Sequence, residues 1–263
     1  MDRNHRRKFG QNFLNNPGII QAILRDIPWE SGHSILEVGP GHGALTKGFL
    51  AGGAKVTSVE IDEVAAGVLK ESIPSPDFRL VLSDFMDFDL EEYVQNNDKS
   101  WLVGNLPYNM ATPIIAKILP HLHHFHGLMI MVQYEAAQRL VAETRTKEYG
   151  FLTVQRACFA SAKLLRKVKP ENFTPKPNVM SATLLLQALP QEERLNPEML
   201  DTVGTGFRQR RKKLMNNWKA LFPTEKILEA YETFGHNPNV RAEELNAKEF
   251  HDLYQFLSDS NPD

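Results

Sequence analysis

The chain has 263 residues, of which 42% are hydrophobic and 24% charged, ordinary proportions for a globular protein. This length fits one large domain, or a domain of about 150–200 residues with a smaller one. No apolar run approaches the roughly 20 residues that span a bilayer, and none follows the cationic first residues. We therefore expect a cytoplasmic protein without a membrane segment or secretory signal. The single cysteine, Cys158, lies in an apolar run and is expected to be buried and inert.

Positive charge is concentrated in three segments. The formal net charge is only −2, yet residues 1–8, 163–169 and 208–219 contain 14 of the 30 lysines and arginines and one acid. The remainder carries 16 cations against 31 acids. This asymmetry predicts a basic face on an acidic body, as a nucleic-acid partner requires. Three unrelated solvated surfaces are the alternative.

Strand-like and helical patterns alternate through the first two-thirds of the chain. Short apolar runs predict seven strands, at residues 34–39, 55–61, 79–82, 101–105, 128–133, 164–168 and 181–186. Helical spacing of apolar residues predicts helices at 43–50, 63–72, 112–119 and 135–143. The alternation indicates an α/β fold with a mainly parallel seven-stranded sheet covered on both faces. The last two strands are expected to pair antiparallel at one edge.

A polar stretch at residues 190–197 separates this region from the rest of the chain. Beyond it the strand signals end, and four helical patterns follow, at 200–207, 213–221, 225–231 and 247–257. The sequence therefore predicts a first domain of residues 1–189 and a small all-helical domain of residues 190–263.

Three glycines follow the first predicted strand. Gly39, Gly41 and Gly43 allow positive φ and a close approach of a ligand to the backbone. A dinucleotide enzyme would space them G-x-G-x-x-G, with a pyrophosphate at the helix N-terminus. The tighter spacing, preceded by the acid Glu37, suits a cofactor with a charged amino-acid end and no phosphate. S-adenosylmethionine fits this description.

Two further acids end the next two predicted strands. Glu60 is placed to accept hydrogen bonds from ribose hydroxyls, a role common to enzymes of NAD and of S-adenosylmethionine. Asp84 is placed to accept from an adenine amino group, with Phe85 available to pack on the ring. Each acid alone could be a strand-end or capping residue. Together with the glycines they favour S-adenosylmethionine over NAD.

The segment Asn105-Leu106-Pro107-Tyr108 ends the fourth predicted strand. The Asn105 side-chain oxygen and the Leu106 carbonyl could accept both hydrogens of a nucleobase amine and localise its lone pair. Pro107 fixes the turn, and Tyr108 offers a face on which the base can stack. Alternatively, this is a strand-to-helix turn with asparagine as a cap. Its place after a cofactor loop favours methyl transfer to an exocyclic amine.

These motifs resemble the small-subunit rRNA adenine N6,N6-dimethyltransferases of the KsgA type, which are related to the erythromycin-resistance rRNA methyltransferases. The resemblance covers nearly the whole chain and implies a Rossmann-like methyltransferase fold. Residues 7–14 resemble the family's opening motif, which implies that Asn12 and Leu14 contact the cofactor. The glycine-loop, ribose, adenine and amine motifs fall in family order at Gly39, Glu60, Asp84 and Asn105.

Two later motifs resemble the family with one departure each. A signature M-x-Q-K-E has Tyr134 in place of the usual lysine. A loop F-x-P-x-P-K-V begins at Phe173 and has Asn178 in place of its lysine. The resemblance implies that Phe173 stacks on the flipped base opposite Tyr108.

The C-terminal motifs favour the small-subunit enzymes over the resistance enzymes. Residues 207–213 resemble the segment F-x-x-R-R-K, and residues 241–245 resemble the closing R-A-E-x-L. A solvated helix face is the alternative explanation of these cations. We expect RNA contacts from seven residues: Arg6, Arg7, Lys8, Arg208, Arg210, Arg211 and Lys212.

The resemblance implies a specific reaction. It is the S-adenosylmethionine-dependent dimethylation, at N6, of two adjacent adenosines in a hairpin near the 3′ end of 16S rRNA, within the immature small ribosomal subunit, with a role in subunit biogenesis. The alternatives are an assembly factor that acts mainly by binding, and a large-subunit rRNA methyltransferase that confers antibiotic resistance. We expect a monomer. Despite four histidines in residues 121–126, we expect no metal site, because no convergent ligand pattern accompanies them.

Overall fold

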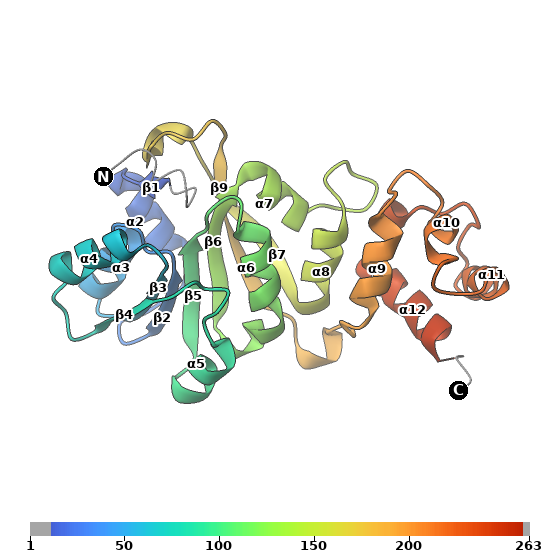
Figure 1. The fold of residues 1–263 in the computed structure, drawn as a ribbon, viewed down its shortest axis with the longest axis horizontal. Coiled ribbons are helices and arrows are strands. Elements are labelled where there is room, and N and C mark those ends of the chain that lie inside the picture. Colours follow the sequence, from blue (N-terminus) through green and yellow to red (C-terminus); the bar gives the residue numbers. More distant parts are fainter. Residues whose placement is uncertain (1–11, 260–263) are drawn as a thin grey trace. The chain divides into compact units, whose positions relative to one another are not determined.

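The computed structural model describes residues 12–259 and divides the chain into two compact units (Figure 1). Within that range, unit 1 comprises residues 12–137 and Ser161–Ala188, and unit 2 comprises Gln138–Ala160 and residues 189–259. The sequence predicts a single boundary near residue 189. The structure instead assigns Gln138–Ala160 to the second unit as well, because Val154 and Cys158 are fully buried in its core.

Unit 1 is built on a seven-stranded sheet, and all seven predicted strands are present. Its strands are β2 (Ser34–Val38), β3 (Lys55–Glu60), β4 (Phe78–Leu82), β5 (Ser100–Asn105), β6 (Gly127–Gln133), β7 (Ala160–Val168) and β9 (Ser181–Ala188). Their spatial order is β4-β3-β2-β5-β6-β9-β7. Strands β2 to β6 are parallel, and β9 is antiparallel to β6. The α/β prediction is confirmed.

Burial explains why the central strands are easily recognised. The first five residues of β5 and the first six of β6 are buried, as expected where helices cover both faces of a parallel sheet. The helices of unit 1 are α2 (Pro17–Asp26), α3 (Ala44–Ala51), α4 (Glu63–Ser72), α5 (Leu90–Asn96) and α6 (Ala111–Ile118), with α7 (Tyr134–Leu140) leading into unit 2. Short 3-10 turns, η1 (Leu119–His124) and η2 (Pro170–Asn172), complete the connections.

A two-stranded ribbon joins the N-terminal part of unit 1 to a distant loop. Strand β1 (Phe13–Leu14) pairs antiparallel with β8 (Phe173–Thr174), so that Leu14 lies opposite Phe173 and Phe13 opposite Thr174. Leu14 and Phe173 are both buried in an apolar core that also contains residues of α2 and the central strands. This ribbon therefore holds β1 in place, and with it Phe13, which contacts the glycine-rich segment after β2.

Unit 2 is built from helices around a second apolar core. They are α8 (Phe151–Phe159), α9 (Met199–Phe207), α10 (Leu214–Trp218), α11 (Thr224–Thr233) and α12 (Ala247–Ser258), with short turns η3 (Gln191–Glu193) and η4 (Ala242–Glu244). Trp218 is fully buried at the centre, and its indole nitrogen donates to the Thr202 carbonyl at 2.9 Å. The Tyr149 hydroxyl donates to the Leu245 carbonyl at 2.6 Å, which ties the segment before α8 to the chain before α12.

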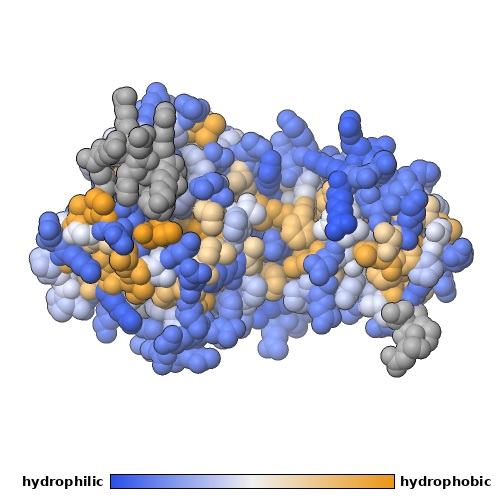
Figure 2. All heavy atoms as spheres, viewed as in Figure 1, coloured by the Kyte–Doolittle hydropathy of each residue, from blue (hydrophilic) through white to orange (hydrophobic). Residues whose placement is uncertain are grey.

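The surface of unit 1 includes exposed apolar side chains. Val64 and Val68 lie one turn apart in α4 and are 46% and 41% exposed, while Leu69 of the same helix is buried. Figure 2 shows apolar residues gathered over the region of α3 and α4 among hydrophilic ones. None of the helices in residues 12–259 is long and apolar enough to cross a membrane.

Candidate active site

A cavity of about 410 Å³ lies at the carboxyl ends of the parallel strands of unit 1. Strand β2 has β3 and β4 on one side and β5 and β6 on the other. Such a reversal of strand order leaves a crevice in which ligands of α/β proteins bind. The lining comes from the last residues of β2, β3 and β5, from the segments that follow β2 to β5, and from residues 12–15, Ile114 and Thr174. The structure thus brings to one place the strand-end motifs that the sequence singled out.

The glycine loop (residues 39–43) requires glycine for two reasons. Gly39, Gly41 and Gly43 have φ of 65°, 57° and 77°, a region that other residues rarely adopt. A Cβ on Gly41 would lie 2.7 Å from Cδ1 of Phe13, closer than van der Waals contact. The Phe13 ring also stacks on His42 at 4.0 Å between centroids. The loop is therefore closed on one side by β1.

Glu60, the last residue of β3, is buried at the edge of the cavity. One carboxylate oxygen accepts from the Gly41 backbone N–H at 3.1 Å, and the other accepts from the Asp62 N–H at 2.9 Å. Burial raises the pKa of Glu60, and these backbone bonds oppose the rise. Each oxygen keeps a lone pair for a ligand hydroxyl. Its position fits the predicted ribose contact.

Glu37, the acid that the sequence analysis noted before the glycines, is a cavity residue to which no specific contact was assigned. It precedes the glycine loop in β2, is only 2% exposed, and lines the cavity. One of its oxygens accepts from the hydroxyls of Thr46 at 2.6 Å and Ser58 at 2.9 Å. Burial raises the pKa of Glu37 to about 7, despite those two bonds. Its place on the strand just before the glycines is the signal on which the sequence analysis drew.

Asp84 and Phe85 follow β4 and line the cavity; their contact with an adenine stays a prediction. One Asp84 oxygen accepts from the Met86 backbone N–H at 2.8 Å, which orients the carboxylate. Phe85 is 5% exposed and contributes an apolar wall. An acceptor beside an apolar surface suits a planar base with an exocyclic amine.

The four residues of segment 105–108 line the same cavity. The side-chain nitrogen of Asn105 donates to the Asn12 carbonyl at 2.9 Å, which leaves the amide oxygen as the atom for a ligand. The Leu106 N–H donates to the Met131 carbonyl at 3.0 Å and holds the turn to β6. This arrangement leaves hydrogen-bond acceptors for an amine beside the cofactor pocket.

Tyr108 is half-buried, and its orientation is fixed by a contact with the first residue of β9, which pairs with the carboxyl end of β6. Its hydroxyl is 2.7 Å from that of Ser181, a fully buried residue at the start of β9. Burial raises the pKa of Tyr108, and the bond to Ser181 opposes the rise. The ring is thereby held at the cavity in a neutral form that can stack on a base.

One predicted site residue, Phe173, lies elsewhere in the structure, and three predicted RNA contacts lie outside the described residues. Phe173 does not line the cavity: it is 3% exposed and packs in the core opposite Leu14, and only its neighbour Thr174 reaches the cavity wall. The predicted stacking of Phe173 on a base therefore has no support in this arrangement. The predicted RNA contacts Arg6, Arg7 and Lys8 lie outside the described residues.

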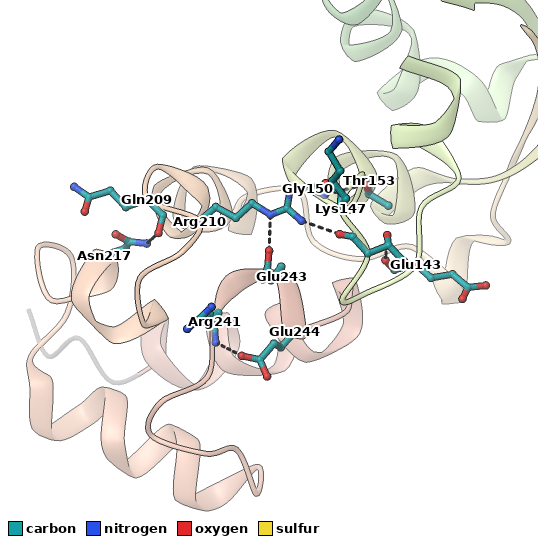
Figure 3. Close-up of polar contacts among 11 residues, drawn as sticks. Glu143, Lys147, Gly150, Thr153, Gln209, Arg210, Asn217, Arg241, Glu243 and Glu244 are labelled. Atoms are coloured by element: carbon teal, nitrogen blue, oxygen red, sulfur yellow. Dashed lines mark hydrogen bonds and ion pairs between the residues drawn. The ribbon is translucent and has the colours of Figure 1, made fainter. Parts of the chain in front are cut away.

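Arg210 is a structural residue of unit 2 in this structure (Figure 3). Its guanidinium bonds to the Glu243 carboxylate at 2.5 Å and donates to the carbonyls of Lys147 at 2.5 Å and Thr146 at 2.7 Å. All three nitrogens are engaged within the protein, so a phosphate would have to compete with them. Arg208, Arg211 and Lys212, in contrast, are exposed.

The donors and acceptors of the cavity suit S-adenosylmethionine. Buried carboxylates at the ends of β2 and β3 favour a ligand with positive charge and hydroxyl donors, and the bare backbone of Gly39 and Gly41 admits its close approach. Within residues 12–259, no three His, Cys, Asp or Glu side chains are grouped so that they could hold a metal ion. The sheet order and this cavity together define a Rossmann-like, S-adenosylmethionine-dependent methyltransferase.

The chain belongs to the ribosomal RNA adenine dimethylase family, whose model matches residues 2–259. It is 35% identical over 258 residues to the ribosomal RNA small subunit methyltransferase A of Clostridium botulinum, covering 96% of this chain and 94% of that protein. It is 37% identical over 249 residues to the protein of that name from Pseudomonas aeruginosa, covering 93% and 91%. The predicted family is confirmed.

Solved structures share the fold. A dimethyladenosine transferase from Plasmodium falciparum superposes with a TM-score of 0.81 at 23% identity, over 94% of this chain and 98% of that one. The 23S rRNA methyltransferase ErmE superposes with a TM-score of 0.66 at 23% identity, over 94% and 100%. At these identities the likeness supports the architecture alone.

Proposed function

We propose that this chain methylates N6 of adenosines in small-subunit rRNA, with S-adenosylmethionine as methyl donor. The observation that carries the proposal is the placement of segment 105–108 on the same cavity as Glu60 and Asp84. A site for an amine then adjoins a site for the donor. The relatives from Clostridium botulinum and Pseudomonas aeruginosa are named as methyltransferases of the small-subunit rRNA, which supports the substrate class.

The residues of segment 105–108 have the chemistry that an adenine amine requires. S-adenosylmethionine supplies a methyl group activated by the positive charge on sulfur. The Asn105 side-chain oxygen and the Leu106 carbonyl accept the two amine hydrogens and localise the nitrogen lone pair. The amine loses a proton once it is methylated, so no strong base is needed before attack. Orientation and proximity then supply on the order of 7–11 kcal/mol.

The base is positioned chiefly by Tyr108. Its ring is fixed by Ser181 and lies on the cavity wall beside Asn105. Stacking on an aromatic ring contributes about 1–3 kcal/mol per base, which helps to hold a base outside its helical stack. Unpaired loop adenosines are the cheapest to extrude, so a hairpin loop suits the site better than a duplex.

The finer assignments extend this proposal. We infer two adjacent adenosines in a hairpin near the 3′ end of the rRNA, presented by the immature small subunit in the cytoplasm. Contacts to the RNA backbone would come from the exposed cations Arg208, Arg211 and Lys212 of unit 2. Arg6, Arg7 and Lys8 remain proposed contacts.

Replacing Asn105 with alanine tests the proposal. Transfer of labelled methyl groups to purified immature small subunits should fall by at least about a thousandfold, since the amine loses its side-chain acceptor. The bond to the Asn12 carbonyl is lost as well, so the affinity for S-adenosylhomocysteine should fall, but by less than about tenfold. Retained transfer would refute the role of Asn105.

Testing several substrates side by side identifies the RNA that is methylated. Immature small subunits, free small-subunit rRNA and large subunits should be compared with the unchanged chain and with Asn105→Ala. We expect label in small-subunit rRNA only, and as N6,N6-dimethyladenosine after digestion. Preferential labelling of large subunits would overturn the substrate assignment. Rescue of subunit assembly by Asn105→Ala in cells lacking the protein would show that binding serves assembly independently of methylation.

A further inference from the structure

Lys117, in α6, makes contacts that none of the site motifs explains. Its ammonium donates to three backbone carbonyls, those of Phe85 at 2.9 Å, Met86 at 2.6 Å and Phe88 at 2.7 Å. An ammonium has three hydrogens, so its hydrogen-bonding capacity is used completely. The nitrogen also lies 5.7 Å from the centroid of the Phe85 ring. One side chain therefore binds both the backbone and the side-chain face of a single short segment.

That segment is the turn that follows β4 (residues 83–88), and its first residues line the cavity. Ser83, Asp84 and Phe85 are cavity residues. The Asp84 carbonyl accepts from the N–H groups of Asp87 at 3.0 Å and Phe88 at 3.1 Å, which makes the turn compact. Three of its carbonyls meet at the Lys117 nitrogen. Without a positive donor there, their dipoles would repel one another.

The other end of the connection is the segment that holds the amine. Helix α6 begins at Ala111, directly after segment 105–108 and its following turn, in which the Met110 N–H donates to the Pro107 carbonyl at 2.9 Å. Lys117 thus links the turn after β4 to the helix that follows Tyr108. Its contacts therefore connect the part of the cavity formed by Asp84 and Phe85 with the part formed by segment 105–108, which must be correctly placed relative to each other for methyl transfer.

We propose that Lys117 is a positioning residue whose ammonium holds the turn of Asp84 and Phe85 in place for the adenine end of the cofactor. The proposal rests on the proposed function, because it takes Asp84 and Phe85 as the adenine contacts. Lys117 touches no reacting atom. Its effect should therefore fall on the affinity for adenosine-bearing ligands, and little on the affinity for RNA or on the rate at saturation.

Replacing Lys117 with methionine keeps the length of the side chain and removes its charge. Binding of S-adenosylhomocysteine, measured by calorimetry on the full chain, should weaken by at least about tenfold, because three charge-assisted bonds are lost. The KM for small-subunit rRNA and the kcat at saturating donor should stay within about threefold of the unchanged chain. Lys70→Met, at an exposed position in α4, is the matched control and should leave all three quantities unchanged.

Chemical rescue separates positioning from a general structural role. Lys117→Cys, alkylated with 2-bromoethylamine, regains an ammonium on a side chain of lysine length. Its affinity for S-adenosylhomocysteine should return to within about threefold of that of the unchanged chain. Alkylation with iodoacetamide adds a neutral group and should not restore it. The natural Cys158 is fully buried, and burial raises its pKa to about 12, so it contributes almost no thiolate. Lys70→Cys treated in the same way controls for the reagent.

The unchanged chain offers a measurement that needs no variant. Burial lowers the pKa of Lys117, while the carboxylates of Asp87, Asp84 and Asp89 oppose that shift. Loss of its proton leaves two donors for three carbonyls, so binding should weaken as pH rises through that lowered pKa. The probe is 5′-methylthioadenosine, which carries adenine and ribose and has no amino group that titrates in this range.

The outcomes are distinct. Folded Lys117→Met that binds S-adenosylhomocysteine with unchanged affinity overturns the positioning role, as does rescue by the neutral adduct equal to that by the ammonium. If the variants do not fold, an affinity for 5′-methylthioadenosine that stays constant up to the ordinary lysine pKa overturns it. If the unchanged chain binds no S-adenosylhomocysteine, the proposed function fails, and this proposal with it.

Discussion

At the scale of single residues, the buried glutamates of the cavity differ in how they are held. Glu60 accepts from two backbone N–H groups, one to each oxygen. Glu37 accepts from two hydroxyls on one oxygen and is the more strongly perturbed, with a pKa raised to about 7. Burial is the largest cause of this rise; the two hydroxyl bonds oppose it, and the nearby Glu60 carboxylate adds to it. Glu37 therefore changes charge near neutral pH.

This titration predicts a dependence of stability on pH. The folded state keeps the Glu37 proton up to about pH 7, while the unfolded chain releases it near the ordinary value of 4.5. The free energy of unfolding should therefore fall as pH rises from 4.5 to above 7, by roughly 3 kcal/mol from this residue. Denaturant unfolding of the unchanged chain and of Glu37→Gln, at several pH values, measures the difference. Parallel curves would contradict the prediction.

The site was predictable where a side chain's direction follows from its strand. Glu60 and Asn105 are the last residues of β3 and β5, and Asp84 follows β4; the carboxyl ends of such parallel strands lie at one edge of the sheet. Phe173 and Arg210 were not predictable in this way. The direction of Phe173 depends on pairing with β1, and that of Arg210 on Glu243, partners that lie far away in the sequence.

At the scale of elements, the glycine loop and β1 act as one unit. Gly41→Ala would impose a left-handed φ on alanine and bring its Cβ to 2.7 Å from Phe13. We expect a loss of about 1–2 kcal/mol from the backbone alone. The displaced Phe13 or loop should weaken S-adenosylhomocysteine binding by more than about tenfold. Thermal unfolding and calorimetry measure both effects.

Gly67→Ala provides the matched control for this substitution. Gly67 lies within α4, and a Cβ there meets no atom within 4 Å. Alanine in a helix interior should stabilise the chain by about 0.5–1 kcal/mol and leave the affinity unchanged. If Gly41→Ala bound the ligand as tightly as Gly67→Ala, the loop would not be closed by Phe13 as the structure shows.

The strands were more predictable than the helices. The central strands β5 and β6 are buried on both faces and give continuous apolar runs. All seven strands of the large sheet were predicted, whereas the two-residue strands β1 and β8 were not. Helix α8 was missed because α8 passes directly from Phe159 into β7 at Ala160, with no residue that marks its end. Helix α2 was missed although it has a clear start: Asn16 caps it and Pro17 is its first residue.

At the scale of the whole molecule, the uneven charge predicts how RNA binding responds to salt. Arg211 is exposed, so Arg211→Ala should lower the slope of log affinity against log salt by about 0.7–1 and change stability by less than about 0.5 kcal/mol. Arg210 is bound to Glu243 and two carbonyls, so Arg210→Ala should instead destabilise the chain by about 1–3 kcal/mol. Filter binding to small-subunit rRNA measures the salt slope, and denaturant unfolding measures the stability, of both variants.

Glu243→Gln completes this comparison. It removes the ionic partner of Arg210 while keeping the shape of the side chain, and it should lower stability in the same direction as Arg210→Ala. A lower salt slope for Arg210→Ala with unchanged stability would show that this guanidinium faces RNA and not the protein.

The assignment of Gln138–Ala160 to unit 2 affects how this chain can be divided or recombined. The chain passes between the units three times, after residues 137, 160 and 188. A fragment that ends at residue 189 would keep α8 but lose the helices that cover Val154 and Cys158. It would then expose an apolar surface that favours aggregation. A chimera that takes unit 2 from a relative must therefore exchange two separate segments of the chain, with junctions near residues 137, 160 and 188.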